Sequence, residues 1–277
     1  EVSRICAGLE REITAFRERS LTHTSFPYVC CDATFCKVRV GAHVVSQALV
    51  VATGVSIDGT REVLGTAVGD SESFEFWREF LASLKARGLS GVHLVISDAH
   101  AGLKVAVAQQ FTNSSWQRCR VHFMRNLHTA VSAKHAPAVT AAVKTIFAHT
   151  EPDEVAAQWD RVADTLAASF PKVAAMMGEA KTDVLAFTAF PKAHWQKIWS
   201  NNPIERLNKE IKRRADVVEI FPNPAAFLRL ATAVVIESHD EWQVTRRYLS
   251  DVSMDELRAV IAAKHAAAAL AKQHQIA

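Results

Sequence analysis

The 277-residue sequence is poor in cysteine and has no long apolar run. Its five cysteines are an odd number, include no Cys-x-x-Cys pair, and fall mainly in one apolar stretch. This pattern argues against a disulfide framework and favours reduced, buried thiols, as in cytosolic proteins. The most apolar stretch, residues 44–55, is interrupted by Ser46 and Gln47. It is too short for a membrane span, which needs about 20 apolar residues.

Other signals are also missing. No charged-then-apolar leader opens the chain, so nothing predicts secretion. No G-x-G-x-x-G or P-loop sequence occurs, which makes a nucleotide-dependent metabolic enzyme the weakest alternative. Neither sign of charge dominates, since 32 basic against 29 acidic residues leave a net charge of +3. That balance permits nucleic-acid binding without demanding it.

What is present is a globular composition, with 49% hydrophobic and 22% charged residues. This excludes disorder as the main state. Hydrophobic spacing predicts a helix over residues 1–20 and a final Ala-rich helix over 251–277. Between them, residues 123–195 carry only helical spacing, and we interpret them as an all-helical insertion. We therefore expect five segments: 1–25, 26–122, 123–195, 196–250 and 251–277.

Residues 26–122 alternate between strand and helix signals. Strands over 28–40, 44–54 and 62–68 predict an antiparallel meander, because Asp58-Gly59 favours a tight turn. A helix follows from residue 74, with Asp70 or Ser71 as its expected cap. The apolar run 92–96 predicts a central parallel strand. The remaining predicted elements are a helix over 101–110, a strand-like piece over 116–121, a loop over 195–202, and helices over 203–214 and 225–238.

Three acidic residues occupy unusual places. Asp32 interrupts an apolar strand, where an unpaired charge is costly. Asp98 follows the short strand, and ligand sites in α/β sheets gather at such ends. Glu205 lies in the first turn of a helix. Each also has a structural interpretation, namely a buried salt bridge for Asp32, a helix cap for Asp98, and for Glu205 a capping box with Asn202 as N-cap and Pro203 at N1.

Together the three carboxylates suggest one chemistry. Strand one and strand four are neighbours in the sheet of RNase H-like domains, where three antiparallel strands are followed by parallel ones. Asp32 and Asp98 would then lie side by side and attract a hard cation such as Mg²⁺. A third carboxylate, Glu205, would complete a two-metal site for in-line phosphoryl displacement.

The Glu205 helix is basic, because residues 201–214 hold five basic and two acidic side chains. A solvated charged face is one interpretation. The other is a metal carboxylate beside phosphate-binding cations, which are Arg206, Lys209, Lys212 and Arg213. Residues 116–126 form a second basic cluster, with Arg118, Arg120 and Arg125 as candidate phosphate contacts. Cys119-x-x-His122 lacks a matching second pair for zinc, so a packed Cys119 with His122 facing the site or DNA is favoured.

At these residues the sequence resembles bacterial insertion-sequence transposases of the Mutator-like type, which carry a DDE catalytic triad. The resemblance covers nearly the whole chain. The matching segments are Asp32-Ala33-Thr34, residues 61–72, Ser97-Asp98-Ala99-His100, residues 116–122, and residues 186–191 through 220–223. Asp98 follows Asp32 by 66 residues and Glu205 follows Asp98 by 107, leaving room for a helical insertion.

The resemblance implies an α/β, RNase H-like fold with an all-α insertion domain and the catalytic triad Asp32, Asp98 and Glu205. It implies two Mg²⁺ ions, with Mn²⁺ as a substitute, and no small-molecule cofactor. Cys119, His122 and Asn202 match family signature positions, and Lys212 falls where the family places a basic residue. Expected partners are the terminal inverted repeats, target DNA and at least a second copy of the chain, in the bacterial cytoplasm at the nucleoid.

Family members carry an N-terminal DNA-binding region before this point, and this sequence begins with Glu1 rather than Met. We therefore expect residues 1–25 to be the end of such a region. The predicted function is metal-dependent DNA cleavage followed by 3′-OH strand transfer. Two alternatives stay open, which are a catalytically inactive DNA-binding remnant and another RNase H-like nuclease acting on RNA or branched DNA.

Overall fold

The computed structural model describes the backbone of residues 2–245 and 247–276, and the side chains of residues 8, 10–202, 204–245 and 247–270. Glu1 and the Cys6 thiol, part of the predicted helix over 1–20, lie outside the described residues. The chain divides into two compact units. Unit 1 comprises residues 1–56, 60–116 and 201–248, and unit 2 comprises residues 57–59, 117–200 and 249–277.

Unit 1 is built on a mixed sheet whose strand order is β3-β2-β1-β4-β5, with β6 also paired to β1. The β1–β2 and β2–β3 pairs are antiparallel, whereas β4 and β6 run parallel to β1. The predicted meander and the predicted parallel fourth strand are therefore confirmed. The strands are β1 (Tyr28–Val40), β2 (His43–Val55), β3 (Arg61–Gly69), β4 (Leu94–Ser97), β5 (Ser115–Arg118) and β6 (Ile220–Phe221).

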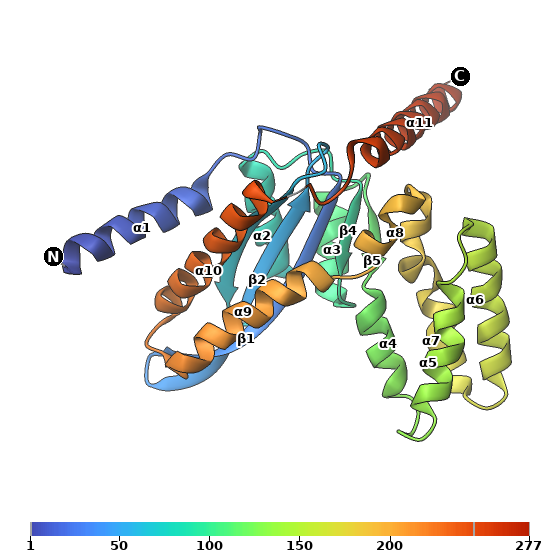
Figure 1. Cartoon of the computed structure of the whole chain (residues 1–277), viewed down its shortest axis with the longest axis horizontal. Coiled ribbons are helices and arrows are strands. Elements are labelled where there is room, and N and C mark those ends of the chain that lie inside the picture. Colours follow the sequence, from blue (N-terminus) through green and yellow to red (C-terminus); the bar gives the residue numbers. More distant parts are fainter. Residues whose placement is uncertain (1, 246, 277) are drawn as a thin grey trace. The chain divides into compact units, whose positions relative to one another are not determined.

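Helices cover both faces of this sheet. Two of them, α2 and α3, lie on one face, and α9 and α10 cross the other (Figure 1). The helices of unit 1 are α1 (Val2–Glu18), α2 (Phe74–Ala86), α3 (Ala101–Gln110), α9 (Asn202–Val218) and α10 (Pro224–Val244).

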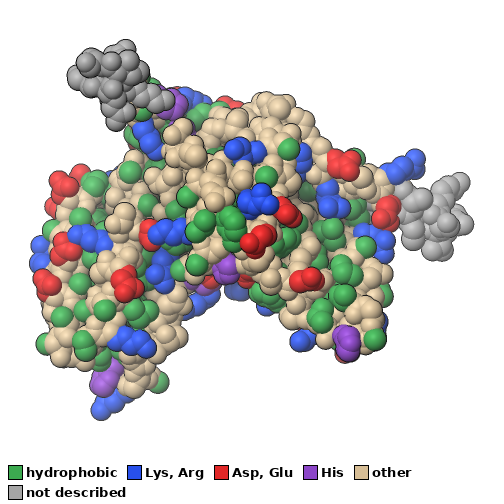
Figure 2. All heavy atoms as spheres, turned by 180° about the vertical axis from the view of Figure 1, so that it is seen from behind, with side chains coloured by type: hydrophobic (Ala, Val, Ile, Leu, Met, Phe, Trp, Pro, Cys, Tyr) green, Lys and Arg blue, Asp and Glu red, His purple; other side chains and the backbone are tan. Residues whose placement is uncertain are grey.

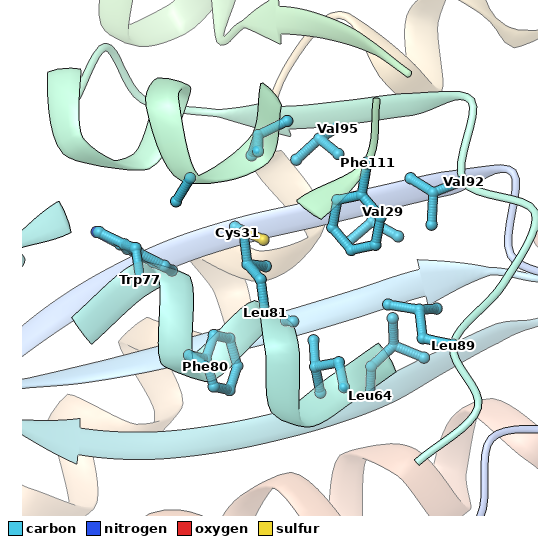
Figure 3. Close-up of a cluster of buried hydrophobic side chains, with 14 of the residues drawn as sticks. Val29, Cys31, Leu64, Trp77, Phe80, Leu81, Leu89, Val92, Val95 and Phe111 are labelled. Carbon is cyan, nitrogen blue, oxygen red and sulfur yellow. The ribbon is translucent and has the colours of Figure 1, made fainter. Parts of the chain in front are cut away.

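Each face of the sheet has its own apolar core. Trp77 and Leu81 of α2 pack with Val29 and Cys31 of β1, and Figure 3 shows these side chains converging from helix and strand. On the other face, buried side chains of α9 and α10 pack against Val38 of β1. Because successive side chains of a strand point to opposite faces, the inward Cys31 directs Asp32 toward the α9 face.

Unit 2 is helical apart from the end of β5. Its helices are α4 (Arg120–His128), α5 (Ala136–Ile146), α6 (Pro152–Ala167), α7 (Pro171–Val184), α8 (Trp195–Ile198) and α11 (Asp251–Ile276), with 3₁₀ turns at Ala186–Ala189 and Lys192–His194. Proline occupies one of the first two positions of α5, α6 and α7, where its missing N–H costs nothing. Trp159 is buried and stacks on Phe123 with ring centroids 5.5 Å apart.

Three local predictions were wrong. The cap of α2 is Ser73, whose side chain accepts a hydrogen bond from the Phe76 amide, because β3 extends to Gly69 and the chain turns before the helix starts. The expected loop over 195–202 contains the short helix α8. The strand-like piece over 116–121 ends at Arg118, since α4 begins at Arg120.

The surface mixes charges of both signs. Figure 2 shows Lys and Arg side chains interspersed with Asp and Glu over the visible face, as the net charge of +3 implies. Among the described residues, no helix combines the length and apolar character that crossing a bilayer requires.

Candidate functional site

Asp32 lies where the partner strand of β1 changes. On one side, β1 pairs with β2 throughout, and Asp32 faces Val51. On the other side, Tyr28 to Cys30 pair with β4, and Lys37 and Val38 pair with β6. Between these two partners the strand edge is left to α9, whose Asn201 side chain donates a 3.0 Å hydrogen bond to the Cys31 carbonyl. Asp32 is half-buried beside this contact.

Asp98 follows the neighbouring strand directly. The parallel register pairs Cys30 with Ile96, and continuing it by two residues sets Asp98 opposite Asp32. Adjacent strands lie about 4.8 Å apart, so the two carboxylates belong to the same edge of the sheet. The interpretation of Asp98 as a helix cap is wrong. His100 is the N-cap of α3, and its Nδ1 accepts a 3.3 Å hydrogen bond from the Leu103 amide.

Glu205 lies in the first turn of α9, the helix that packs against β1. The capping-box interpretation is wrong, because the N-cap is Asn201, which makes no side-chain cap bond, and Asn202 is already helical. The Glu205 amide instead donates to the Asn201 carbonyl at 2.9 Å. Ile204 and Leu207 pack into the core, so the neighbouring polar stripe of Asn201, Glu205 and Asn208 borders β1.

Asn208 was not among the predicted site residues, yet it makes the direct contact with Asp32. Its Nδ2 donates a 2.8 Å hydrogen bond to Asp32 Oδ2, and the residue is only 7% exposed. Its Oδ1 is buried and accepts no hydrogen bond within the described part of the chain. The only sequence signal was its spacing, three residues after Glu205 on the same helical face.

Glu72 is a second residue that sequence reasoning missed as a site residue. It lies in the connection between β3 and α2 and is half-buried. Burial raises the pKa of its carboxyl; the charge of Asp98 acts in the same direction, whereas His100 opposes it. Glu72, Asp98 and His100 thus interact at one end of the sheet.

The three predicted triad residues lie on neighbouring elements of one face of unit 1. Among the side chains that the structure describes, no three His, Cys, Asp or Glu residues form a ready-made metal group. The structure therefore brings Asp32, Asp98 and Glu205 to one region without closing them into a cluster. The donors there are carboxylate and amide oxygens, the ligand type that Mg²⁺ prefers.

The predicted DNA-contacting cations of α9 differ in their surroundings. Arg206, Lys209 and Lys212 are exposed. Arg213 is exposed too, but it forms two hydrogen bonds of 2.7 and 2.9 Å with Glu210. Those bonds hold the Arg213 guanidinium on its own helix.

The predicted contacts near residue 120 belong to unit 2. The Arg120 guanidinium lies 3.9 Å from the Trp199 ring centre and 4.6 Å from that of Phe147, and burial lowers its pKa. Arg118 lies over Phe123, while Arg125 is exposed. Cys119 is a buried free thiol at the N-cap of α4, and His122 is half-buried.

Comparisons with known proteins agree with the sequence resemblance. The family described as "Transposase, Mutator family" matches residues 1–245. The chain is 44% identical over 261 residues to the transposase of insertion sequence element IS1081 from Mycobacterium tuberculosis. It is 37% identical over 257 residues to that of ISRM5 from Rhizobium meliloti, and 37% identical over 252 residues to that of IS256 in transposon Tn4001 from Staphylococcus aureus.

These matches cover 94%, 93% and 90% of this chain but only 63%, 64% and 64% of the respective relatives. The chain thus spans less than two thirds of their length. The family match nevertheless covers most of both units. This chain belongs to the Mutator family of transposases.

Proposed function

We propose that the chain is the catalytic part of a DNA transposase with an RNase H-like core in unit 1 and an inserted all-helical domain. The observation that carries the proposal is the placement of Asp32 and Asp98 in one continued parallel register, with Glu205 on the helix bonded to the same strand. The strand order, with β1 between antiparallel β2 and parallel β4, supports the RNase H-like assignment.

In this function Asp32, Asp98 and Glu205 hold two Mg²⁺ ions, for which Mn²⁺ substitutes. When bound, the ions supply charge stabilisation at the scissile phosphate and acidify the attacking hydroxyl group. Water attacks a phosphodiester at the element end, which breaks one P–O bond and releases a 3′-OH and a 5′-phosphate. That 3′-OH then attacks a target phosphodiester, forming one P–O bond and breaking another.

The chain's own cations serve the substrate. Exposed Arg206, Lys209 and Lys212 lie on the helix that carries Glu205, and they neutralise DNA phosphates on either side of the reacting one. The partners are the terminal inverted repeats, target DNA and at least one further copy of the chain for pairing the two ends. The setting is the bacterial cytoplasm, at the nucleoid.

The proposal is tested by nicking of supercoiled plasmid in Mg²⁺ or Mn²⁺. Asp32→Asn, Asp98→Asn and Glu205→Gln each remove one carboxylate with little change of shape, and each is expected to abolish nicking. Full activity in any of the three would contradict the assigned triad. DNA binding without nicking by the unaltered chain would favour the inactive-remnant alternative. Cleavage of RNA in preference to DNA would favour a different nuclease.

A further inference from the structure

Asn208 is the one described side chain with a printed hydrogen bond to the carboxylate of Asp32, and it is buried where the neighbouring cations are not. Its Nδ2 lies 2.8 Å from Asp32 Oδ2, and the residue is 7% exposed. Lys209 and Lys212, on the same helix, are both exposed. The buried donor to Asp32 is therefore an uncharged amide.

We propose that Asn208 is a positioning residue that fixes the Asp32 carboxylate for cation binding while leaving its negative charge uncompensated. This inference rests on the proposed function, because it assigns Asn208 a role toward the cation held by Asp32. A Lys or Arg in the same place would neutralise the carboxylate that the cation needs. An amide orients one carboxylate oxygen by a hydrogen bond and leaves the other oxygen available.

The second polar atom of Asn208 points to the same role. Its Oδ1 is buried and accepts no hydrogen bond within the described residues, and such groups are costly unless something meets them. A hydrated cation beside Asp32 would supply a donor, since its bound waters carry polarised O–H groups. One side chain thereby holds the carboxylate with its nitrogen and receives a water of the cation with its oxygen.

The helix itself is held at the same strand. Asn201, one turn before Glu205, donates to the Cys31 carbonyl at 3.0 Å, and Asn208 donates to the next residue of β1. Asn201, Glu205 and Asn208 share one face of α9 by their spacing. Two amides thus fix the helix on both sides of Glu205, but only Asn208 touches a carboxylate, which provides a matched control.

The test measures Mn²⁺ binding to the 277-residue chain by the electron paramagnetic resonance signal of free Mn²⁺. Loss of a partner that orients a metal ligand typically costs about 10–100-fold in metal affinity. Asn208→Ala is therefore expected to raise the Mn²⁺ dissociation constant by that factor with the stoichiometry retained. Asn201→Ala, which removes a buried hydrogen bond of similar kind, is expected to lower thermal stability and change the dissociation constant less than threefold.

A second measurement uses Mg²⁺ and nuclear magnetic resonance. The side-chain amide signal of Asn208, identified by its loss in Asn208→Ser, is expected to shift on addition of Mg²⁺ to the unaltered chain. Asn208→Ser also replaces Asn208→Ala in the binding assay if the alanine variant fails to fold. A merely structural role would reduce the folded fraction, and with it the stoichiometry, without moving the dissociation constant.

The outcomes separate this inference from the proposed function. Wild-type affinity in both Asn208 variants, with Asp32→Asn deficient, would overturn the role of Asn208 and leave the metal site standing. Wild-type affinity in Asp32→Asn would overturn the metal site itself, and the role of Asn208 with it. Equal weakening by Asn201→Ala and Asn208→Ala would assign the effect to helix docking and overturn the positioning role.

Discussion

The side chain of Asn201 donates a 3.0 Å hydrogen bond to the backbone carbonyl of Cys31, across 170 residues of sequence, and both residues are fully buried. The contact closes the edge of β1 at the point where β4 ends. It thereby fixes the start of α9, which carries Glu205, next to the residue before Asp32.

Replacing Asn201 with alanine is expected to destabilise unit 1. The variant leaves the buried Cys31 carbonyl without its donor, and an unsatisfied buried polar group costs about 1–3 kcal/mol. The free energy of unfolding in urea measures the effect. Asn202→Ala is the control, because Asn202 is exposed and a surface substitution changes stability by about 0.5 kcal/mol or less. Equal effects of the two substitutions would contradict the expectation.

Gly59 is expected to tolerate no side chain. Its φ is +78°, and a Cβ there would lie 2.4 Å from the Leu249 carbonyl oxygen. The Leu249 amide also donates to the Gly59 carbonyl at 3.0 Å, so the two segments cannot separate without losing this bond. Gly59→Ala should cost more than the roughly 1–2 kcal/mol of a left-handed conformation alone.

Gly178 provides the matched control for Gly59. It lies within α7, and a Cβ there would meet nothing within 4 Å. Because alanine is the better helix former, Gly178→Ala should stabilise the chain by about 0.5–1 kcal/mol. Thermal unfolding of both variants measures the contrast, and a destabilised Gly178→Ala with an unaffected Gly59→Ala would contradict it.

His194 is expected to make stability depend on pH. The residue is fully buried, and burial lowers the pKa of its imidazole from 6.5 to about 4. The unfolded chain therefore takes up a proton as the pH falls through 6.5, whereas the folded chain does not until about pH 4. Stability present above pH 6.5 is thus lost between these values, by up to about 3 kcal/mol in total.

The measurement compares the wild-type chain with His194→Gln by urea unfolding at several pH values. Acidic groups change stability in both chains, so the difference between them isolates the histidine. The free energy of unfolding should fall more steeply in the wild type than in the variant between pH 6.5 and 4. Parallel curves would show that His194 does not titrate differently in the two states.

DNA affinity is expected to depend on salt through α9. Under the proposed function, Lys209 and Lys212 each contact a phosphate, so each alanine substitution should lower the slope of log affinity against log salt by about 0.9. Arg213→Ala should change the slope less, since Glu210 already engages this guanidinium. Lys172, exposed at the start of α7, is the control. A slope unchanged in the double variant would contradict the assignment of α9 to DNA.

Much of unit 1 followed from local pattern. The β-branched and aromatic run over 28–40 predicted β1 to the residue, and helical spacing predicted α3 over 101–110. Alternation along β1, set by hydrophobic side chains on one face, required that Asp32 point away from Cys31. These features depend on neighbours in sequence, so periodicity was sufficient to find them.

Caps and partners followed from tertiary packing instead. Several residues near each helix start had suitable side chains, and where the preceding strand ended decided that Ser73 caps α2 and His100 begins α3. Asn201 was unavailable as a side-chain cap because its amide is used by β1, 170 residues away. Such choices depend on which buried backbone groups need a partner.

The sequence by itself determined the elements, the alternation of β1 and the three misplaced acidic residues. Only the tertiary structure decided that Asp98 continues the register of Asp32, that Glu205 lies on a helix bonded to β1, and that Asn208 donates to Asp32. The reason is physical. An amide three residues after a glutamate looks like any polar surface residue until the fold buries it beside a carboxylate, where desolvation requires each polar atom to find a partner.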